Sequence, residues 1–287
     1  MYDGSQVKTR EDWSRQREYL KAMLAHYQYG HMPPRPKTLT VNQTGSADVL
    51  GGKAVQIEFT ITISRRDKSV DLHVALVRPK RAGKFPVIIK NDRLLFERPT
   101  DKRGLPGHAA EKVVLAEAVK RGYIICKYVR TDLAADLPGK RNGGVFPLYP
   151  EYDWGVIAAW AWGYQIVIDA LKTMEFADTD RIVVTGYSRG GKTALCGAVY
   201  DERIAIAAPN SSGTGGTGSM RYFEKGQRPQ TIAKHIGKHD HWWNKRFMKF
   251  ASKEKKLPFD AHFAKALIAP RGLVNPHALG DYWANPY

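Results

Sequence analysis

The chain has 287 residues and a formal net charge of +17, and apolar residues make up 43% of it. This length suits one large α/β domain or two small ones, and the apolar fraction is enough for a substantial buried core. No run of about 18 apolar residues occurs, so the sequence predicts no membrane-spanning helix. The basic residues are dispersed and no recognised nucleic-acid-binding motif accompanies them, which argues against a DNA- or RNA-binding protein.

The N-terminal part predicts one helix followed by paired strands. Apolar residues recur at helical spacing in residues 11–28, and the proline-rich residues 30–36 are expected to end this helix. Strand-like alternation follows in residues 55–63 and again in residues 72–77, and the short gap between them suits a hairpin. We therefore expect antiparallel strands at the start of the sheet.

From residue 85 onward, short apolar runs alternate with longer helical patterns. The apolar runs are residues 85–89, 123–129, 182–185 and 204–208, and the helical patterns are residues 109–121, 155–174 and 192–200. This alternation is typical of a doubly wound, mostly parallel sheet with helices on both faces. With the antiparallel strands before it, the pattern predicts a three-layer α/β-hydrolase fold in a single domain, residues 1–287.

The pentapeptide Gly186-Tyr187-Ser188-Arg189-Gly190 stands between a predicted strand and a predicted helix. In that context G-x-S-x-G is a nucleophile elbow, because its glycines allow a turn sharp enough to expose the serine oxygen above the sheet. The backbone N–H groups at the start of the helix then lie beside that oxygen and favour negative charge there. We predict that Ser188 is a catalytic nucleophile rather than an incidental serine in a glycine-rich turn.

Several stretches of the chain resemble one family. Residues 186–192 resemble the G-x-S-R-x-G-K signature of the glucuronoyl esterases of carbohydrate esterase family 15, particularly the bacterial members. Further similar stretches are residues 154–163, 201–205, 212–216, 257–260 and 266–271. The resemblance implies a secreted or periplasmic enzyme of lignocellulose degradation that uses no cofactor and no metal. It would cleave the ester between 4-O-methylglucuronic acid on xylan and an alcohol of lignin.

The resemblance also implies roles for single residues. Ser188 would attack the ester carbon and form an acyl-enzyme. Arg189 would place a charged donor where the tetrahedral oxygen develops negative charge. Lys192, one helical turn after the serine, would hold a sugar hydroxyl. Gln227 would contact the sugar, since it lies near the position where the family usually has a glutamate.

The acid and the histidine of the triad follow from the same resemblance. Some members carry a glutamate where this chain has Ser211, so Asp281, after the penultimate core strand, is the candidate acid. The family places a sugar-contacting tryptophan two residues beyond that acid, where Trp283 stands. A hydrolase of this fold orders its triad Ser, acid, His, and no histidine follows Asp281. We therefore expect the chain to lack the last strand and helix, with the catalytic histidine, and to hydrolyse esters only weakly.

The other histidines do not complete the triad on sequence grounds. His277 precedes the candidate acid, and His108, His241 and His262 lie in other segments. Histidine and tryptophan are dense in residues 239–243, but no cysteine or glutamate pattern accompanies them. We expect this group to pack beside the substrate cleft rather than to bind zinc.

The residues alone do not show in which cellular compartment the protein works. Cys126 and Cys196 lie in apolar segments and are expected to be buried free thiols; a disulfide between them is the alternative. Residues 1–5 lack the basic-then-apolar pattern of a signal peptide. Secretion therefore rests on the resemblance, as does the expectation of a monomer whose partner is glucuronoxylan or a lignin–carbohydrate ester.

Two alternative functions stay open at this point. Within the same class, the chain would be an acetylxylan esterase or another acyl esterase. From a different class, it would be a catalytically impaired fragment that binds acidic glycans through Lys192, Trp283 and the basic surface. Binding to nucleic acid or to a membrane ranks below both.

Overall fold

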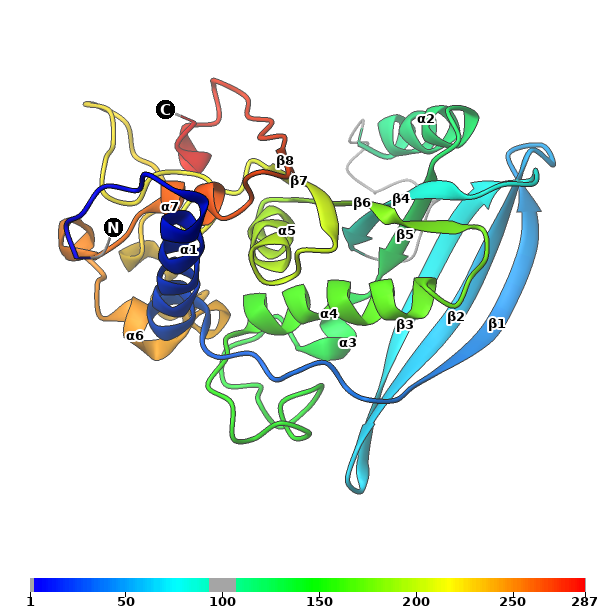
Figure 1. Cartoon of the computed structure of the whole chain (residues 1–287), viewed down its shortest axis with the longest axis horizontal. Coiled ribbons are helices and arrows are strands. Elements are labelled where there is room, and N and C mark those ends of the chain that lie inside the picture. The colour runs from blue at the N-terminus through cyan, green and yellow to red at the C-terminus, as the bar shows by residue number, and fades with distance from the viewer. Residues whose placement is uncertain (1–2, 93–106, 287) are drawn as a thin grey trace.

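The computed structural model describes residues 3–92 and 107–286, apart from the side chains of residues 107–110. His108, one of the histidines considered above, has a side chain outside the described residues. Within them, one eight-stranded sheet has the order β1-β2-β3-β5-β4-β6-β7-β8 (Figure 1). The strands are β1 (Leu39–Val49), β2 (Ala54–Arg65), β3 (Lys68–Pro79), β4 (Phe85–Asn91), β5 (Ile124–Tyr128), β6 (Ala177–Tyr187), β7 (Ile204–Asn210) and β8 (Gly272–Leu273).

The strand pairing divides the sheet into an antiparallel and a parallel part. The pairs β1–β2, β2–β3 and β3–β5 are antiparallel. The pairs β5–β4, β4–β6, β6–β7 and β7–β8 are parallel. This confirms the mostly parallel sheet with antiparallel N-terminal strands, and the predicted hairpin is β2 and β3. β1 was not predicted, because most of its residues are exposed and polar at the edge of the sheet.

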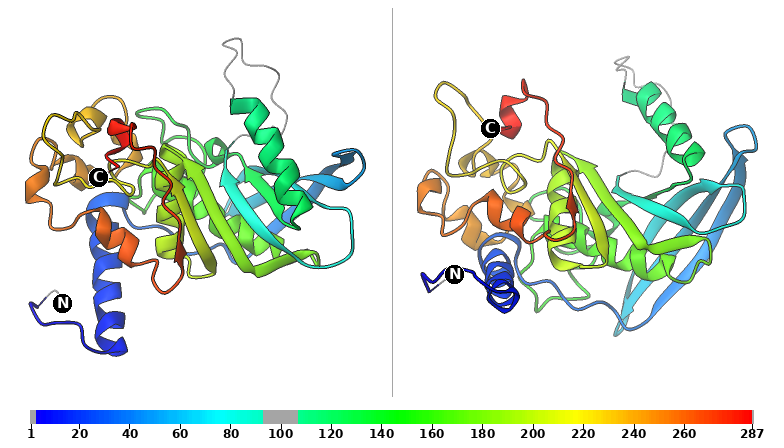
Figure 2. Two further views of the ribbon diagram at one scale, coloured as in Figure 1. Left: turned by 90° about the horizontal axis from the view of Figure 1, so that it is seen from above. Right: turned by 45° about the horizontal axis from the view of Figure 1, so that its top comes forward.

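Helices cover both faces of the sheet, as Figures 1 and 2 show. The α-helices are α1 (Arg10–Leu24), α2 (Gly107–Lys120), α3 (Arg130–Leu133), α4 (Val156–Leu171), α5 (Arg189–Tyr200), α6 (Lys245–Met248) and α7 (Ala261–Ala266). A π-helical turn, η1 (Ala25–Tyr29), continues α1. Short 3-10 turns are η2 (Ala233–His235), η3 (Asp240–Trp242), η4 (Glu254–Lys256) and η5 (Tyr282–Ala284).

The side chains of β3 show why the sheet is buried on both sides. Val74 and Leu76 belong to the large core that includes α4 and α5. Ala75 and Val77 belong to a smaller apolar cluster that includes Leu115 of α2. Successive residues of a strand point to opposite faces, so these two clusters are the two sides of one sheet. The predicted three-layer α/β-hydrolase architecture is therefore confirmed.

The N-terminal helix ends at a glycine rather than at the prolines. Gly30 has φ +79°, and a Cβ at this position would lie 2.4 Å from the backbone oxygen of Asp153. The chain therefore leaves the helix where only glycine fits against the neighbouring segment. The prolines that were expected to end the helix follow in the extended connection to β1.

The parallel strands bring chemically important residues to one edge of the sheet. Asn91 ends β4, Arg130 comes two residues after β5, and Ser188 directly follows β6. The carboxyl ends of parallel strands lie at the same edge, where α/β proteins bind their ligands. Loops after these strands therefore form the candidate site.

The structure bears on two further predictions, one about the two cysteines and one about membrane-spanning helices. Cys126 and Cys196 are both free and buried, as expected. Burial raises the pKa of both thiols, so neither is a reactive thiolate. In the part of the chain that the structure describes, no helix combines the length and the apolar composition that a membrane crossing requires.

Candidate active site

Ser188 has the strained backbone of a nucleophile elbow. Its φ and ψ are 55° and −117°, a conformation that non-glycine residues rarely adopt. Its N–H donates to the Asn210 carbonyl at 3.0 Å, and its own carbonyl accepts from the Lys192 N–H at 3.1 Å. A Cβ on Gly186 would lie 2.5 Å from the carbonyl carbon of Gly190. The two glycines therefore let β6 and α5 approach closely enough for the serine to stand at the turn.

A pocket of about 320 Å³ opens at this turn. It is lined by Lys90, Asn91, Asp92, Arg130, Gly186, Tyr187, Ser188, Arg189 and Gly190. The first residues of α5 supply unpaired backbone N–H groups and the positive end of a helix dipole. Ser188 thus lines a cavity whose electrostatic character favours a developing oxyanion.

Arg189 is held by a network that the sequence did not reveal. Its guanidinium forms an ion pair with Asp136 and lies 4.9 Å above the centre of the Trp242 ring. The Asp136 carboxylate also accepts from His241 Nε2 at 3.1 Å and from Trp242 Nε1 at 2.7 Å. Burial raises the pKa of Asp136, but these hydrogen bonds and the Arg189 charge outweigh it and hold that pKa below its usual range. Asp136 is therefore a fixed anion that orients Arg189.

The histidine and tryptophan group of residues 239–243 packs beside this network. Trp242 and Trp243 are buried, and the His239 ring stacks on Trp242 with centroids 4.1 Å apart. Among the described residues, no group of three or more His, Cys, Asp or Glu side chains is arranged to hold a metal ion.

Lys192 lies deeper than its predicted role would require. Its side chain is 2% exposed, and its ammonium donates to the Ser212 carbonyl and, at 3.0 Å, to Gln230 Oε1. Burial and the nearby Arg189 charge lower the pKa of Lys192 to about 7. It is not among the residues that line the pocket at Ser188. In this structure the Lys192 ammonium is thus hydrogen-bonded to acceptors of the protein itself.

Gln230, rather than Gln227, is the glutamine joined to Lys192. The Gln227 amide donates to Glu224 Oε2 at 3.2 Å in an exposed loop. Gln230 is buried, and its backbone N–H donates to the Trp283 carbonyl at 2.9 Å. The structure therefore joins Lys192, Gln230 and the Trp283 backbone in one chain of contacts. No spacing rule in the sequence distinguishes the two glutamines.

Trp283 is exposed and Asp281 caps the turn that carries it. The Trp283 side chain is 52% exposed, with the Lys234 ammonium 4.6 Å from its ring centre. Asp281 Oδ1 accepts from the Ala284 N–H at 3.3 Å. The ring is thus available to a ligand, and the carboxylate serves as the cap of η5.

Several of the described histidines bond to partners other than Ser188. His241 bonds to Asp136, His277 Nε2 lies 2.9 Å from Thr217 Oγ1, and the His235 ring accepts from Trp243. In residues 3–92 and 111–286, none hydrogen-bonds to the serine hydroxyl. The pocket therefore brings together Ser188, the start of α5 and the guanidinium groups of Arg130 and Arg189.

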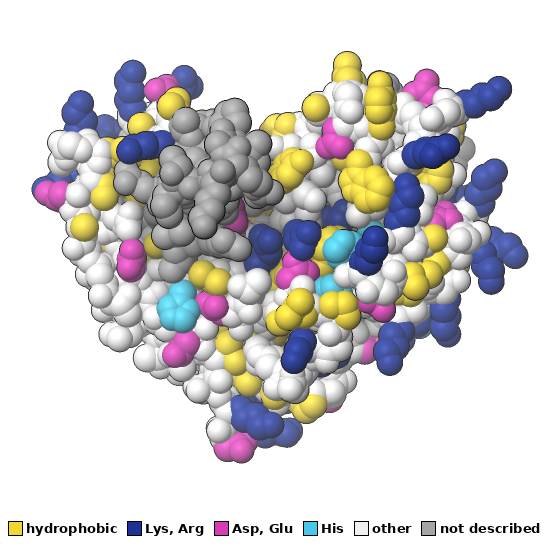
Figure 3. All heavy atoms as spheres, turned by 180° about the vertical axis from the view of Figure 1, so that it is seen from behind, with side chains coloured by type: hydrophobic (Ala, Val, Ile, Leu, Met, Phe, Trp, Pro, Cys, Tyr) yellow, Lys and Arg dark blue, Asp and Glu magenta, His cyan; other side chains and the backbone are white. Residues whose placement is uncertain are grey.

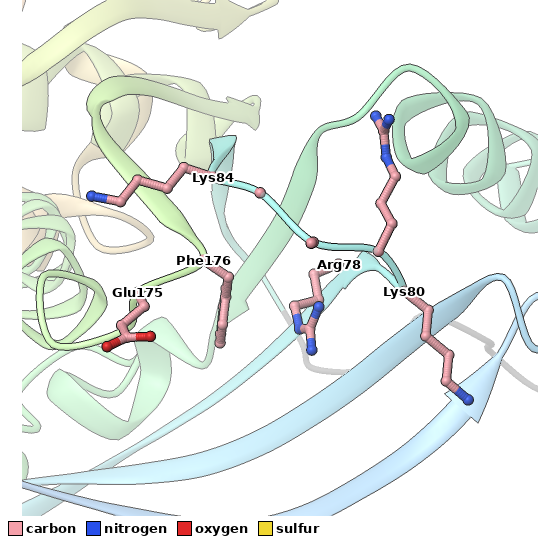
Figure 4. A pocket seen from close by; sticks show the side chains of 8 residues that line it. Arg78, Lys80, Lys84, Glu175 and Phe176 are labelled. Carbon is pink, nitrogen blue, oxygen red and sulfur yellow. The ribbon is translucent and has the colours of Figure 1, made fainter.

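A larger hollow lies at the opposite edge of the sheet. A cavity of about 820 Å³ is lined by Arg78 of β3, by the turn between β3 and β4, including Lys80 and Lys84, and by Phe176. Arg78 lies beside the Phe176 ring, but Lys80 and Lys84 point away from each other (Figure 4). The face in Figure 3 likewise carries scattered Lys and Arg side chains rather than one patch. We therefore place the candidate site at Ser188.

A family sequence model described as "Glucuronyl esterase, fungi" matches residues 61–286. The chain belongs to the glucuronoyl esterase family. This confirms the family resemblance of the elbow and of the other stretches named above, all of which lie within the matched region.

Relatives and solved structures agree with this assignment. A 4-O-methyl-glucuronoyl methylesterase from Hypocrea jecorina (strain QM6a) is 29% identical over 95% of this chain and 54% of its own length. A glucuronoyl esterase from Solibacter usitatus superposes with a TM-score of 0.85 and 26% identity, covering 99% of this chain and 79% of that one. A mutant glucuronoyl esterase from Sporotrichum thermophile, in complex with methyl 4-O-methyl-β-D-glucopyranuronate, has a TM-score of 0.75 and 25% identity, covering 99% and 71%. The chain thus spans about half the length of the fungal relative.

Proposed function

We propose that this chain is a carbohydrate esterase that hydrolyses carboxyl esters of 4-O-methylglucuronic acid. The observation that carries the proposal is the backbone of Ser188, held at φ 55° between β6 and α5 with Arg189 directly after it. Strain of this kind costs about 1–3 kcal/mol and persists where function requires the exposed side chain. The substrate class is that of relatives named 4-O-methyl-glucuronoyl methylesterases.

In this mechanism Ser188 Oγ attacks the ester carbon and a tetrahedral oxyanion forms. The N–H groups at the start of α5 and the Arg189 guanidinium would stabilise that oxyanion, and Asp136 would keep the guanidinium in place. The alcohol then leaves, and water hydrolyses the acyl-enzyme. Removing one oxyanion donor of this kind typically costs about 10²–10³ in rate.

We propose that the catalytic base is a histidine outside the described residues, oriented by Asp281. The support is that no described histidine hydrogen-bonds to the Ser188 hydroxyl, while Asp281 lies on the segment after β8. A longer version of the chain that continues through such a histidine would then hydrolyse esters much faster than residues 1–287.

The sugar would lie beside Trp283 and Lys192. The exposed ring of Trp283 supplies an apolar face for a sugar. Lys192 would share its protons between Gln230 and a sugar hydroxyl, and Gln227 would reach the sugar from its exposed loop. We further propose that the natural substrate is the ester between glucuronoxylan and lignin, met by a secreted or periplasmic monomer.

The test is the product released by a longer version of the chain. Methyl 4-O-methylglucuronate should yield methanol, whereas acetylated xylan should yield no acetate. Acetate release without methanol release would replace the proposed function with that of an acyl esterase.

A further inference from the structure

Arg130 is a second guanidinium in the pocket of Ser188. Its Nη1 donates to the Asn91 carbonyl at 2.5 Å, and the guanidinium lies 4.8 Å from the ring centre of Trp160 in α4. The Asn91 side chain in turn donates to the Gly190 carbonyl at 3.0 Å. Arg130 is therefore fixed to the end of β4 and, through Asn91, to the first turn of α5.

The other cations that line this pocket have carboxylate partners. Lys90 binds Glu111 at 2.9 Å, and Arg189 is paired with Asp136. Among the described residues, Arg130 forms no ion pair. A guanidinium keeps its charge in proteins, so within the described part of the chain Arg130 is a charged group without a paired counter-ion.

Burial makes this unpaired charge costly. Arg130 Nε is buried without a hydrogen-bond partner, and burial lowers the pKa of the guanidinium. Asp92, which lines the same pocket, and Asp136 act in the opposite direction. An anion that entered the pocket would pair with Arg130 and recover part of this cost.

The Asn91 side chain links Arg130 to the start of α5. Its Oδ1 lies 3.4 Å from Arg130 Nη1 and would lie 3.0 Å from a Cβ on Gly190. A Cβ on Gly190 would lie 3.8 Å from Arg130 Nη1. The positive end of the helix and the guanidinium therefore act on the same space beside Ser188. A planar carboxylate fits a guanidinium by two parallel hydrogen bonds.

We propose that Arg130, together with Arg189, forms a carboxylate-binding site beside Ser188 that retains the free uronate. This inference rests on the proposed function. In deacylation, water adds to the acyl carbon, the bond from that carbon to Ser188 Oγ breaks, and Oγ regains a proton from the water. The released acid then gives its proton to solvent and becomes a carboxylate. Because the ester is uncharged at this carboxyl group, Arg130 favours the product over the substrate and makes glucuronate a competitive inhibitor.

The test is direct binding of sodium glucuronate to residues 1–287 by isothermal titration calorimetry, with uncharged glucuronamide as the comparison ligand. The parent should bind glucuronate at least about tenfold more tightly than glucuronamide. Arg130→Gln should remove this preference, and Arg130→Lys should keep part of it. Unchanged glucuronate binding in a folded Arg130→Gln variant would overturn the proposal.

Arg141→Gln is the matched control. Arg141 also lies over an aromatic ring, at 3.9 Å from the centre of Phe146, and donates to a backbone carbonyl, that of Trp154. It does not line the pocket, so this variant should bind glucuronate like the parent. Equal loss in both variants would contradict a local role for Arg130.

A crystal structure with glucuronate covers the case in which Arg130→Gln fails to fold. The carboxylate should lie about 3 Å from the Arg130 guanidinium, and its placement elsewhere would overturn the proposal. Binding is measured without turnover. A chain that binds glucuronate through Arg130 but never hydrolyses an ester would contradict the proposed function alone.

Discussion

The guanidinium of Arg189 and the carboxylate of Asp136 form an ion pair between residues 53 positions apart in the chain. Asp136 lies after α3 and Arg189 begins α5, so the pair joins the loop after β5 to the nucleophile elbow. With Trp242 below the guanidinium, the pair leaves Arg189 little freedom to turn. The elbow is thus supported from outside its own sequence motif.

Asp136→Asn should lower kcat and leave KM nearly unchanged. The amide keeps the size of the carboxylate but loses the charge that positions Arg189, and a misplacement of about 1 Å at such a site can cost about 10²-fold in rate. Steady-state kinetics of a longer, active version of the chain would measure this. A rise in KM with constant kcat would show that Asp136 serves binding instead.

Ser188→Gly should stabilise the fold while it abolishes hydrolysis. The serine has φ 55°, which glycine adopts at little cost, so relief of the strain should add about 1 kcal/mol to the free energy of unfolding. Urea denaturation of the glycine and alanine variants separates this effect from loss of the hydroxyl. If the alanine variant proved as stable as the glycine variant, the strain would not be real.

Gly186→Ala should destabilise the domain by about 1–3 kcal/mol or more, because its Cβ would lie 2.5 Å from the Gly190 backbone. Gly143→Ala is the control, since a Cβ there meets nothing within 4 Å. Thermal unfolding of the two variants gives the comparison. Similar melting temperatures would argue against the close packing of the elbow.

Lys192→Met should flatten the dependence of stability on pH between about 7 and 10. The pKa of Lys192 is lowered to about 7 in the folded chain and is about 10.4 in an unfolded one. Between these pH values Lys192 carries its proton in the unfolded chain but not in the folded one. The contribution of Lys192 to the free energy of unfolding therefore rises with pH in this range, and it does not change with pH below about 7.

Urea unfolding at several pH values would measure the Lys192 contribution as the difference between parent and variant. The exposed Lys253→Met is the control and should follow the parent. Parallel profiles for the parent and the Lys192→Met variant would show that the pKa of Lys192 is not lowered in the folded chain.

Local patterns predicted much of the fold because each depends on residues close in sequence. The alternation in residues 55–63 predicts β2, and the glycines around Ser188 predict the elbow. β1 could not be predicted in this way, because an exposed edge strand lacks a strong apolar pattern. Its register depends on pairing with β2 from Leu39↔Ile63 onward, which is a tertiary contact.

The supporting residues of the site depend on contacts between distant segments. Nothing near Asp136 indicates that it meets Arg189, and nothing near Gln230 distinguishes it from Gln227. Lys192 is placed on the correct helix by its spacing, but its direction is set by the Ser212 carbonyl and Gln230 in later loops. Motifs therefore located the candidate serine, and only the fold located its neighbours.

The most direct measurement of the central claim is benzyl alcohol release from benzyl glucuronate by a longer version of the chain and by its Ser188→Ala variant. We predict rapid release by the former and release at the uncatalysed rate by the variant. Equal rates from the two proteins would show that Ser188 is not the nucleophile.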